Sequence, residues 1–156
     1  MRRALLAPVL LLGLLAASAC NKPKSYSTMV EVVQARRFGQ GTGMVDLELK
    51  YVDCPGDARR VMRGDKAFAA CAPSIKAGDK LAAELELKYS PEKGQYRSDL
   101  LRLGDCPVSL DAKDESNYEL YQDCQELKRS GSVVGVHCNR QRSPELLAKC
   151  PWLRRK

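Results

Sequence analysis

The chain has few of the residues on which catalytic sites depend. It holds one histidine, His137, in 156 residues, and no GxSxG, HExxH, P-loop or Rossmann glycine pattern. No cysteine pair is spaced as CxxC, which argues against a thioredoxin-like redox site and against the usual zinc sites. The sequence therefore predicts a non-enzymatic protein with no metal and no cofactor. The alternative is a small hydrolase in which His137 assists a nucleophile.

Aromatic residues and a continuous basic stripe are also scarce. With two Phe, six Tyr and one Trp, the core must rely on Leu, Val, Ala and crosslinks. The formal net charge of +7 becomes +5 without Arg2 and Arg3, and residues 140–156 carry all of that excess. A nucleic-acid-binding domain would carry basic side chains throughout its fold, so no nucleic acid partner is predicted.

Residues 1–19 have the pattern of a secretory signal peptide. A basic pair, Arg2 and Arg3, precedes a long uncharged run, and small residues follow it at 17–19. The run is shorter than the ~20 residues that a transmembrane helix needs, and Pro8 and Gly13 interrupt it. We expect the segment to be cleaved.

The cleavage region ends at Cys20. The stretch Ala17-Ser18-Ala19-Cys20 resembles the lipobox of bacterial lipoproteins, whose cysteine is acylated and becomes the new N-terminus. The resemblance covers residues 1–21 only. It implies an acylated Cys20 that anchors the protein to a membrane. Asn21 replaces the aspartate that retains such proteins in the inner membrane, which implies the outer membrane, with the domain facing the periplasm.

The mature chain is organised as one domain. Residues 20–27 are polar and aperiodic and are predicted to be a lipidated tether, and residues 28–156 have the size of a single domain. Lipidation of Cys20 leaves an even number of cysteines, as an oxidising compartment favours. Six cysteines are therefore predicted to form disulfides: Cys54, Cys71, Cys106, Cys124, Cys138 and Cys150.

The order of these cysteines favours local bridges. Two pairs bracket predicted helices, and joining them leaves a third pair: Cys54 with Cys71, Cys138 with Cys150, and Cys106 with Cys124. Another pairing stays open, because a hairpin turn near Gly131 would place Cys124 almost opposite Cys138.

The patterning predicts a mainly β fold. Alternating apolar and polar residues indicate about six strands in three hairpins, at 28–37, 45–51, 81–89, 96–103, 118–127 and 133–138. One short helix or a broken pair of helices is predicted at 58–71 after Asp57, and a further helix at 145–149 after Ser143-Pro144. The expected architecture is a small antiparallel sheet or a partly closed barrel. Its element order resembles an oligonucleotide/oligosaccharide-binding (OB) barrel, which says little about function.

Two functions remain besides the hydrolase. The leading hypothesis is a lipid-anchored interaction or assembly module whose partners are the membrane and another envelope protein. The alternative is a binder of anionic glycans or lipid headgroups through the basic C-terminal segment, in which Trp152 and Leu153 are expected to pack on the domain and residues 154–156 to extend from it. Its candidate anion-binding residues are Arg154, Arg155 and Lys156.

Overall fold

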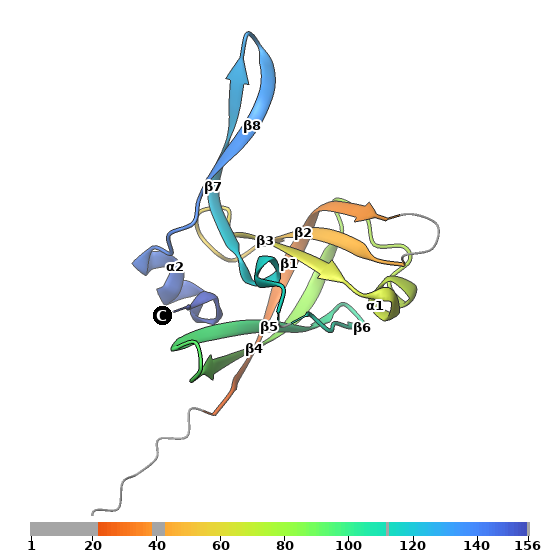
Figure 1. Cartoon of the computed structure of the whole chain (residues 1–156), viewed down its shortest axis with the longest axis vertical. Coiled ribbons are helices and arrows are strands. Elements are labelled where there is room, and N and C mark those ends of the chain that lie inside the picture. The colour runs from red at the N-terminus through yellow and green to blue at the C-terminus, as the bar shows by residue number, and fades with distance from the viewer. Residues whose placement is uncertain (1–21, 39–42, 112, 156) are drawn as a thin grey trace, which may run out of the picture.

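The structure is a computed structural model that describes residues 22–38, 43–111 and 113–155. Within these residues the chain forms eight strands, two α-helices and two 3₁₀ helices (Figure 1). The strands are β1 (Lys24–Arg37), β2 (Val45–Tyr51), β3 (Arg59–Gly64), β4 (Lys80–Ser90), β5 (Gln95–Leu103), β6 (Cys106–Pro107), β7 (Leu120–Arg129) and β8 (Ser132–Asn139). The helices are α1 (Lys66–Cys71), α2 (Pro144–Lys149), η1 (Glu115–Tyr118) and η2 (Pro151–Leu153).

The strands form one antiparallel sheet in the order β6-β5-β4-β1-β2-β3-β7-β8. The long strand β1 joins its two halves: the first part of β1 pairs with β4 and the second part with β2. Val30 and Glu31 pair on both sides, and the register with β2 shifts between Val32 and Gln34. Such an irregularity bends a strand and increases its twist. The sheet therefore curls around its core, but it does not close into a barrel.

The core lies inside this curl. The apolar positions of β2 are buried and its polar positions are half-buried, as the alternation predicts. Phe68 of α1 and Leu146 of α2 are also buried. The largest buried side chains are Tyr51, Phe68, Leu47, Leu49, Met62, Leu85, Leu100, Leu103 and Leu146.

The predicted fold class is confirmed in its coarse form, and of its two architectures the structure has the antiparallel sheet and not the barrel. The chain is mainly β and antiparallel, with two short α-helices and three disulfides, but it has more than six strands and no closed OB-like barrel. The predicted helix at 58–71 is wrong in its first half, since β3 pairs with β2 from Val45 to Lys50. The helix begins only after Asp65, whose side chain accepts a hydrogen bond from the backbone N–H of Phe68.

The structure changes the predicted bounds at both ends of the domain. The tether predicted at 20–27 overlaps the sheet, because residues from Lys24 onward pair with β4. At the other end, the predicted packing of Trp152 and Leu153 is confirmed, because both are buried. The free end predicted after them is wrong at Arg155, whose carbonyl accepts a hydrogen bond of 2.8 Å from Tyr96 N. This segment therefore packs on β5. The predicted helix cap is confirmed, with Ser143 bonded to Leu146 N and Pro144 in the first turn.

All six predicted cysteines form disulfides, but none of the three favoured pairs is correct. The bridges join Cys54 to Cys150, Cys71 to Cys106 and Cys124 to Cys138. The Cys124–Cys138 bridge is the pairing that the hairpin turn left open. The other two connect elements far apart in sequence, which the fold of the sheet brings together. The bridge from Cys54 fastens the end of α2 to the loop between β2 and β3.

Candidate anion-binding cleft

The curl of the sheet brings β3 and β5 near each other without pairing them. Among the described residues, β3 pairs only with β2 and β7, and β5 only with β4 and β6. The side chain of Arg60 in β3 spans the space between them and donates a hydrogen bond to the backbone oxygen of Ser98 in β5. Helix η1 lies against both strands. We call this space the seam.

A cleft opens at the seam, where the C-terminal segment meets it. Its volume is about 40 Å³. Six cationic side chains and only two carboxylates line it, so its lining is strongly positive. The cations are Arg60, Lys93, Arg97, Arg142, Arg154 and Arg155, and the carboxylates are Glu115 and Glu119.

Two of the guanidinium groups have no carboxylate partner. Arg60 is only 3 % exposed and donates to Tyr51 Oη at 3.3 Å and to the Ser98 carbonyl. Arg142 is half-buried and donates from Nε to the carbonyl of Leu153 at 2.6 Å. Neither forms an ion pair with any described carboxylate. Buried charges in proteins are normally paired, so the seam holds uncompensated positive charge.

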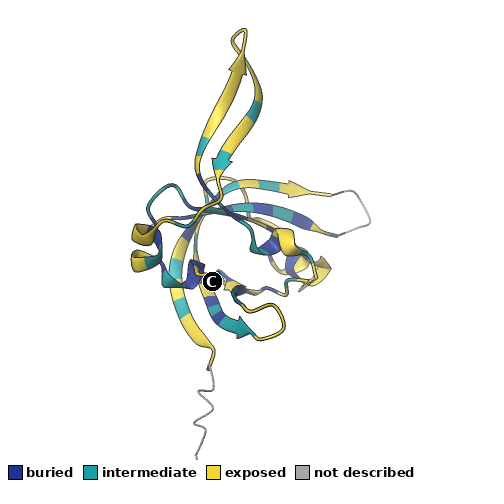
Figure 2. Ribbon diagram, turned by 60° about the vertical axis from the view of Figure 1, so that its left-hand side comes forward, coloured by how far each residue is buried: buried dark blue, intermediate teal, exposed yellow. Residues whose placement is uncertain are grey.

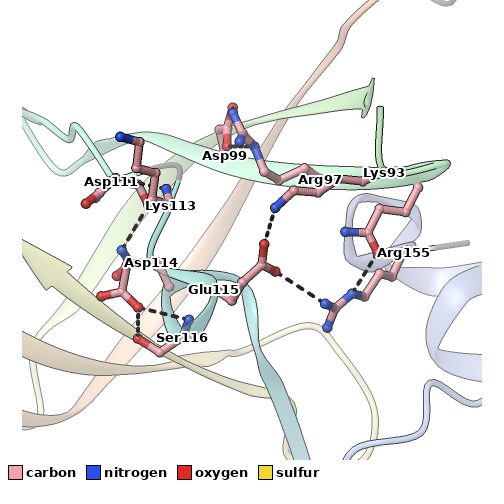
Figure 3. A network of polar contacts seen from close by, with 11 residues as sticks. Lys93, Arg97, Asp99, Asp111, Lys113, Asp114, Glu115, Ser116 and Arg155 are labelled. Atoms are coloured by element: carbon pink, nitrogen blue, oxygen red, sulfur yellow. Dashed lines mark hydrogen bonds and ion pairs between the residues drawn. The ribbon is translucent and has the colours of Figure 1, made fainter. Parts of the chain in front are cut away.

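The remaining lining cations are better compensated. Figure 3 shows Glu115 between Lys93 on one side and Arg155 on the other, the latter at 3.4 Å. Arg97 pairs with Asp99 at 2.8 Å. Arg60 and Arg97 lie over the ring of Tyr118 at 5.7 and 5.1 Å from its centroid, which is the geometry of a cation–π contact. The Tyr118 ring therefore contacts one arginine from each of the two strands at the seam.

The pKa shifts in the cleft agree with this charge distribution. Burial lowers the pKa of Arg142, and the positive charges of Arg155 and Arg60 lower it further. The hydrogen bond from Lys93 holds the pKa of Glu115 below its usual 4.5. Burial raises the pKa of Tyr118, and the charge of Asp99 raises it again, so this tyrosine stays neutral. At neutral pH the guanidinium groups remain protonated, and an anion entering the cleft would reduce their mutual repulsion.

One further polar group at the cleft lacks a partner. Ser98 lines the cleft and is 8 % exposed, and its hydroxyl makes no hydrogen bond within the described residues. A hydroxyl can both donate and accept. Ser98 is therefore a buried polar group beside the cleft with unused hydrogen-bonding capacity.

A second, larger groove adjoins the cleft. Tyr96 and Arg154 belong to both, and the groove has a volume of about 150 Å³. Its other lining residues are Lys22, Lys24, Tyr26, Leu87, Tyr89 and Pro151. Arg154 lies 5.2 Å from the centroid of the Tyr96 ring, and the Tyr89 and Tyr96 rings meet edge to face at 5.2 Å. The groove thus offers aromatic faces next to cations.

The residues predicted from sequence fall in different places. Arg154 and Arg155 line the cleft, whereas Lys156 and Cys20 lie outside the described residues. His137 is exposed on β8, is not part of the cleft, and makes no described hydrogen bond or ion pair to a serine or carboxylate. In residues 22–38, 43–111 and 113–155 no group of three or more metal-ligating side chains occurs.

Sequence reasoning missed Arg60 and Arg142. The first was placed in a predicted helix, on whose surface an arginine is unremarkable. Arg60, Met62 and Gly64 occupy alternate positions and are all buried. This alternation could have indicated a strand with Arg60 on its inner face. Arg142 carried no such clue, because its burial depends on the packing of η2.

No family model, curated protein or solved structure matches this chain. Of the helices in the described part of the chain, none has the length and apolar character needed to cross a membrane.

Proposed function

We propose that this chain is a lipid-anchored protein of the bacterial envelope that binds an anionic glycan or lipid headgroup without catalysis. The observation that carries the proposal is the pair of arginines, Arg60 and Arg142, that face one cleft with no carboxylate to balance them. A buried charge without a counter-charge is costly. A ligand anion in the cleft supplies that counter-charge, and the guanidinium groups suit phosphate and carboxylate oxygens in particular.

The volumes of the two hollows indicate what each accommodates. About 40 Å³ has room for one phosphate or carboxylate group, roughly the space of a few water molecules, and not for a sugar ring. The adjoining groove of about 150 Å³ can hold part of the rest of the ligand against Tyr26, Tyr89 and Tyr96. We therefore assign the anionic group to the cleft and the attached sugar or glycerol to the groove.

The proposed location in the bacterial envelope rests on separate observations. Residues 1–21 resemble a lipoprotein signal, and Cys20 is the residue to be acylated. The three disulfides are of the kind that persists in oxidising compartments. A domain held at a membrane surface would meet envelope glycans and headgroups, whose charged groups are phosphates and carboxylates.

The first prediction tests the cleft with Arg142→Gln. Isothermal titration of the purified protein with a hexose 1-phosphate should give at least about tenfold weaker binding for the variant, because one charge-assisted hydrogen bond contributes about 1.5–3 kcal/mol. Inorganic phosphate should lose affinity in the same proportion, and the uncharged hexose should not bind. Anionic lipid vesicles, as a third probe, distinguish a headgroup ligand from a sugar phosphate.

Lys128→Gln is the matched control, since it removes one positive charge from β7, outside the cleft. It should leave the affinity almost unchanged. Equal losses for Arg142→Gln and Lys128→Gln would show that only net charge matters. Either that result or the absence of binding by every anionic probe would refute the proposal.

The second prediction concerns Glu115 and pH. Glu115→Gln should bind sulfate about threefold to tenfold more tightly at pH 7, because the change removes a negative charge from the cleft. Lys93 lowers the pKa of Glu115 below 4.5, so this carboxylate is ionised throughout the range from pH 8 to pH 5. Sulfate affinity of the wild type should be flat over that range and should rise as the pH falls through the lowered pKa. Fluorescence-detected titration at several pH values measures both effects, and a variant with wild-type affinity and the same rise in acid would contradict the assignment.

A further inference from the structure

The β7–β8 hairpin extends from the body of the molecule, and most of its residues are exposed on both faces (Figures 1 and 2). The sheet ends in β8 on this side, whereas at its other end β6 is only two residues long. Very short edge strands protect a sheet from further pairing. Within the described chain, β8 therefore presents a longer, unpaired edge of backbone N–H and C=O groups.

This edge has no charge and no proline, two of the features that usually prevent strands from pairing, although its register with β7 shifts beside Val134. Residues 132–136, Ser-Val-Val-Gly-Val, contain no charge and no proline. Val133, Val134 and Val136 are 53 %, 64 % and 61 % exposed. Valine favours strands, and an exposed apolar edge without charges favours pairing with another strand.

A tight turn and a disulfide fix the conformation of the hairpin. Ser130 and Gly131 have φ of 51° and 81°, as a tight two-residue turn between hairpin strands requires. The Cys124–Cys138 bridge joins β7 to β8. A two-stranded ribbon is only marginally stable in water, and additional strands stabilise it. The turn and the disulfide thus stabilise a two-stranded ribbon whose outer half has almost no buried side chains.

We infer that β8 is the interface of a symmetric dimer, in which it pairs with β8 of a second copy of this chain. An antiparallel pairing centred on Gly135 places Val134 of each copy opposite Val136 of the partner copy. The dimer then forms a four-stranded ribbon with two Val–Val pairs. Because residues 132–136 carry no charge, the pairing brings no like charges together, although each mature chain is positive overall.

The composition favours a second copy over a foreign chain. A charged edge would select a partner of opposite charge, and this edge offers nothing for such selection. Its valines at alternate positions are complementary to themselves under a two-fold axis, which is the usual symmetry of homodimers. The dimer is independent of the cleft, which lies on other elements.

The experiment compares two double variants that carry the same number of charges. In Val134→Lys/Val136→Lys, lysines meet lysines across the interface. In Val134→Lys/Val136→Glu, each lysine meets a glutamate of the partner copy. Sedimentation equilibrium of the purified full chain in density-matched detergent should show a dimer for the wild type and for the Lys/Glu variant. Self-association of the Lys/Lys variant should be at least about tenfold weaker.

Leu127→Lys serves as the control, because it adds a charge to the hairpin on β7 rather than on the pairing edge. It should remain dimeric. A monomeric wild type would overturn the inference, and so would equal self-association of the two double variants. Anion binding, measured in the same samples, should not change, which separates a failure here from a failure of the cleft.

Discussion

Replacing Cys54 and Cys150 together by alanine should lower the free energy of unfolding by about 4 kcal/mol. The bridge joins residues 96 apart in sequence, and the other two bridges lie within its loop. They shorten the effective loop, which brings the expected effect below the ~4.7 kcal/mol of an uninterrupted loop of about 100 residues. Urea denaturation followed by the signal of Trp152 measures the change, because this tryptophan is 9 % exposed beside the bridge.

The same variant should also lose anion affinity. The bridge holds the end of α2 in place, and the segment around α2 and η2 supplies Arg142, Arg154 and Arg155 to the cleft. Cys124→Ala/Cys138→Ala is the control: its bridge lies in the exposed hairpin, where few buried contacts depend on it. The control should keep anion binding and shift the unfolding of the body less. Equal effects of the two double variants would contradict the role given to the Cys54–Cys150 bridge.

Cys20→Ser should move nearly all of the protein from the membrane fraction to the soluble envelope extract. The lipobox-like stretch predicts that acyl chains attach through the sulfur of Cys20, and serine has no sulfur to modify. Each buried CH₂ contributes about 0.8 kcal/mol, so two or more chains make a durable anchor and their loss is a large effect. Fractionation with immunodetection measures the distribution, and mass spectrometry of the wild type should show an acylated N-terminal cysteine.

Ala17→Leu provides the control, since it brings the stretch closer to the usual lipobox and keeps Cys20. It should remain in the membrane fraction. A wild-type protein that begins at Cys20 without acyl groups would refute the lipoprotein prediction, and the protein would then be simply secreted.

Features that depend on neighbouring residues were predictable. The alternation at 45–51 gave the bounds and the inward face of β2, because a half-buried strand shows its period in the sequence. The cap at Ser143 was equally local, since an N-cap needs only the next three residues. The turn at Ser130-Gly131 and the possible Cys124–Cys138 bridge belong to the same category.

Features that depend on distant partners were not predictable. Strand β3 exists because β2 pairs with it, and the burial of an arginine in it concealed its alternation. Strand β6 is too short for any period to show. The bridges of Cys54 and Cys71 follow the arrangement of the sheet, whereas spacing in the sequence favours only local loops.

The sequence by itself determined the β character, the cysteine set and the positive charge of the C-terminal segment. Only the tertiary structure decided where that charge acts. The curl of the sheet brings β3 beside β5, and η2 and the Cys54–Cys150 bridge hold the chain end there, so that Arg60 and Arg142 face one cleft. The reason is physical: burial and charge repulsion depend on which groups surround an arginine in space, and its neighbours in the sequence do not specify them.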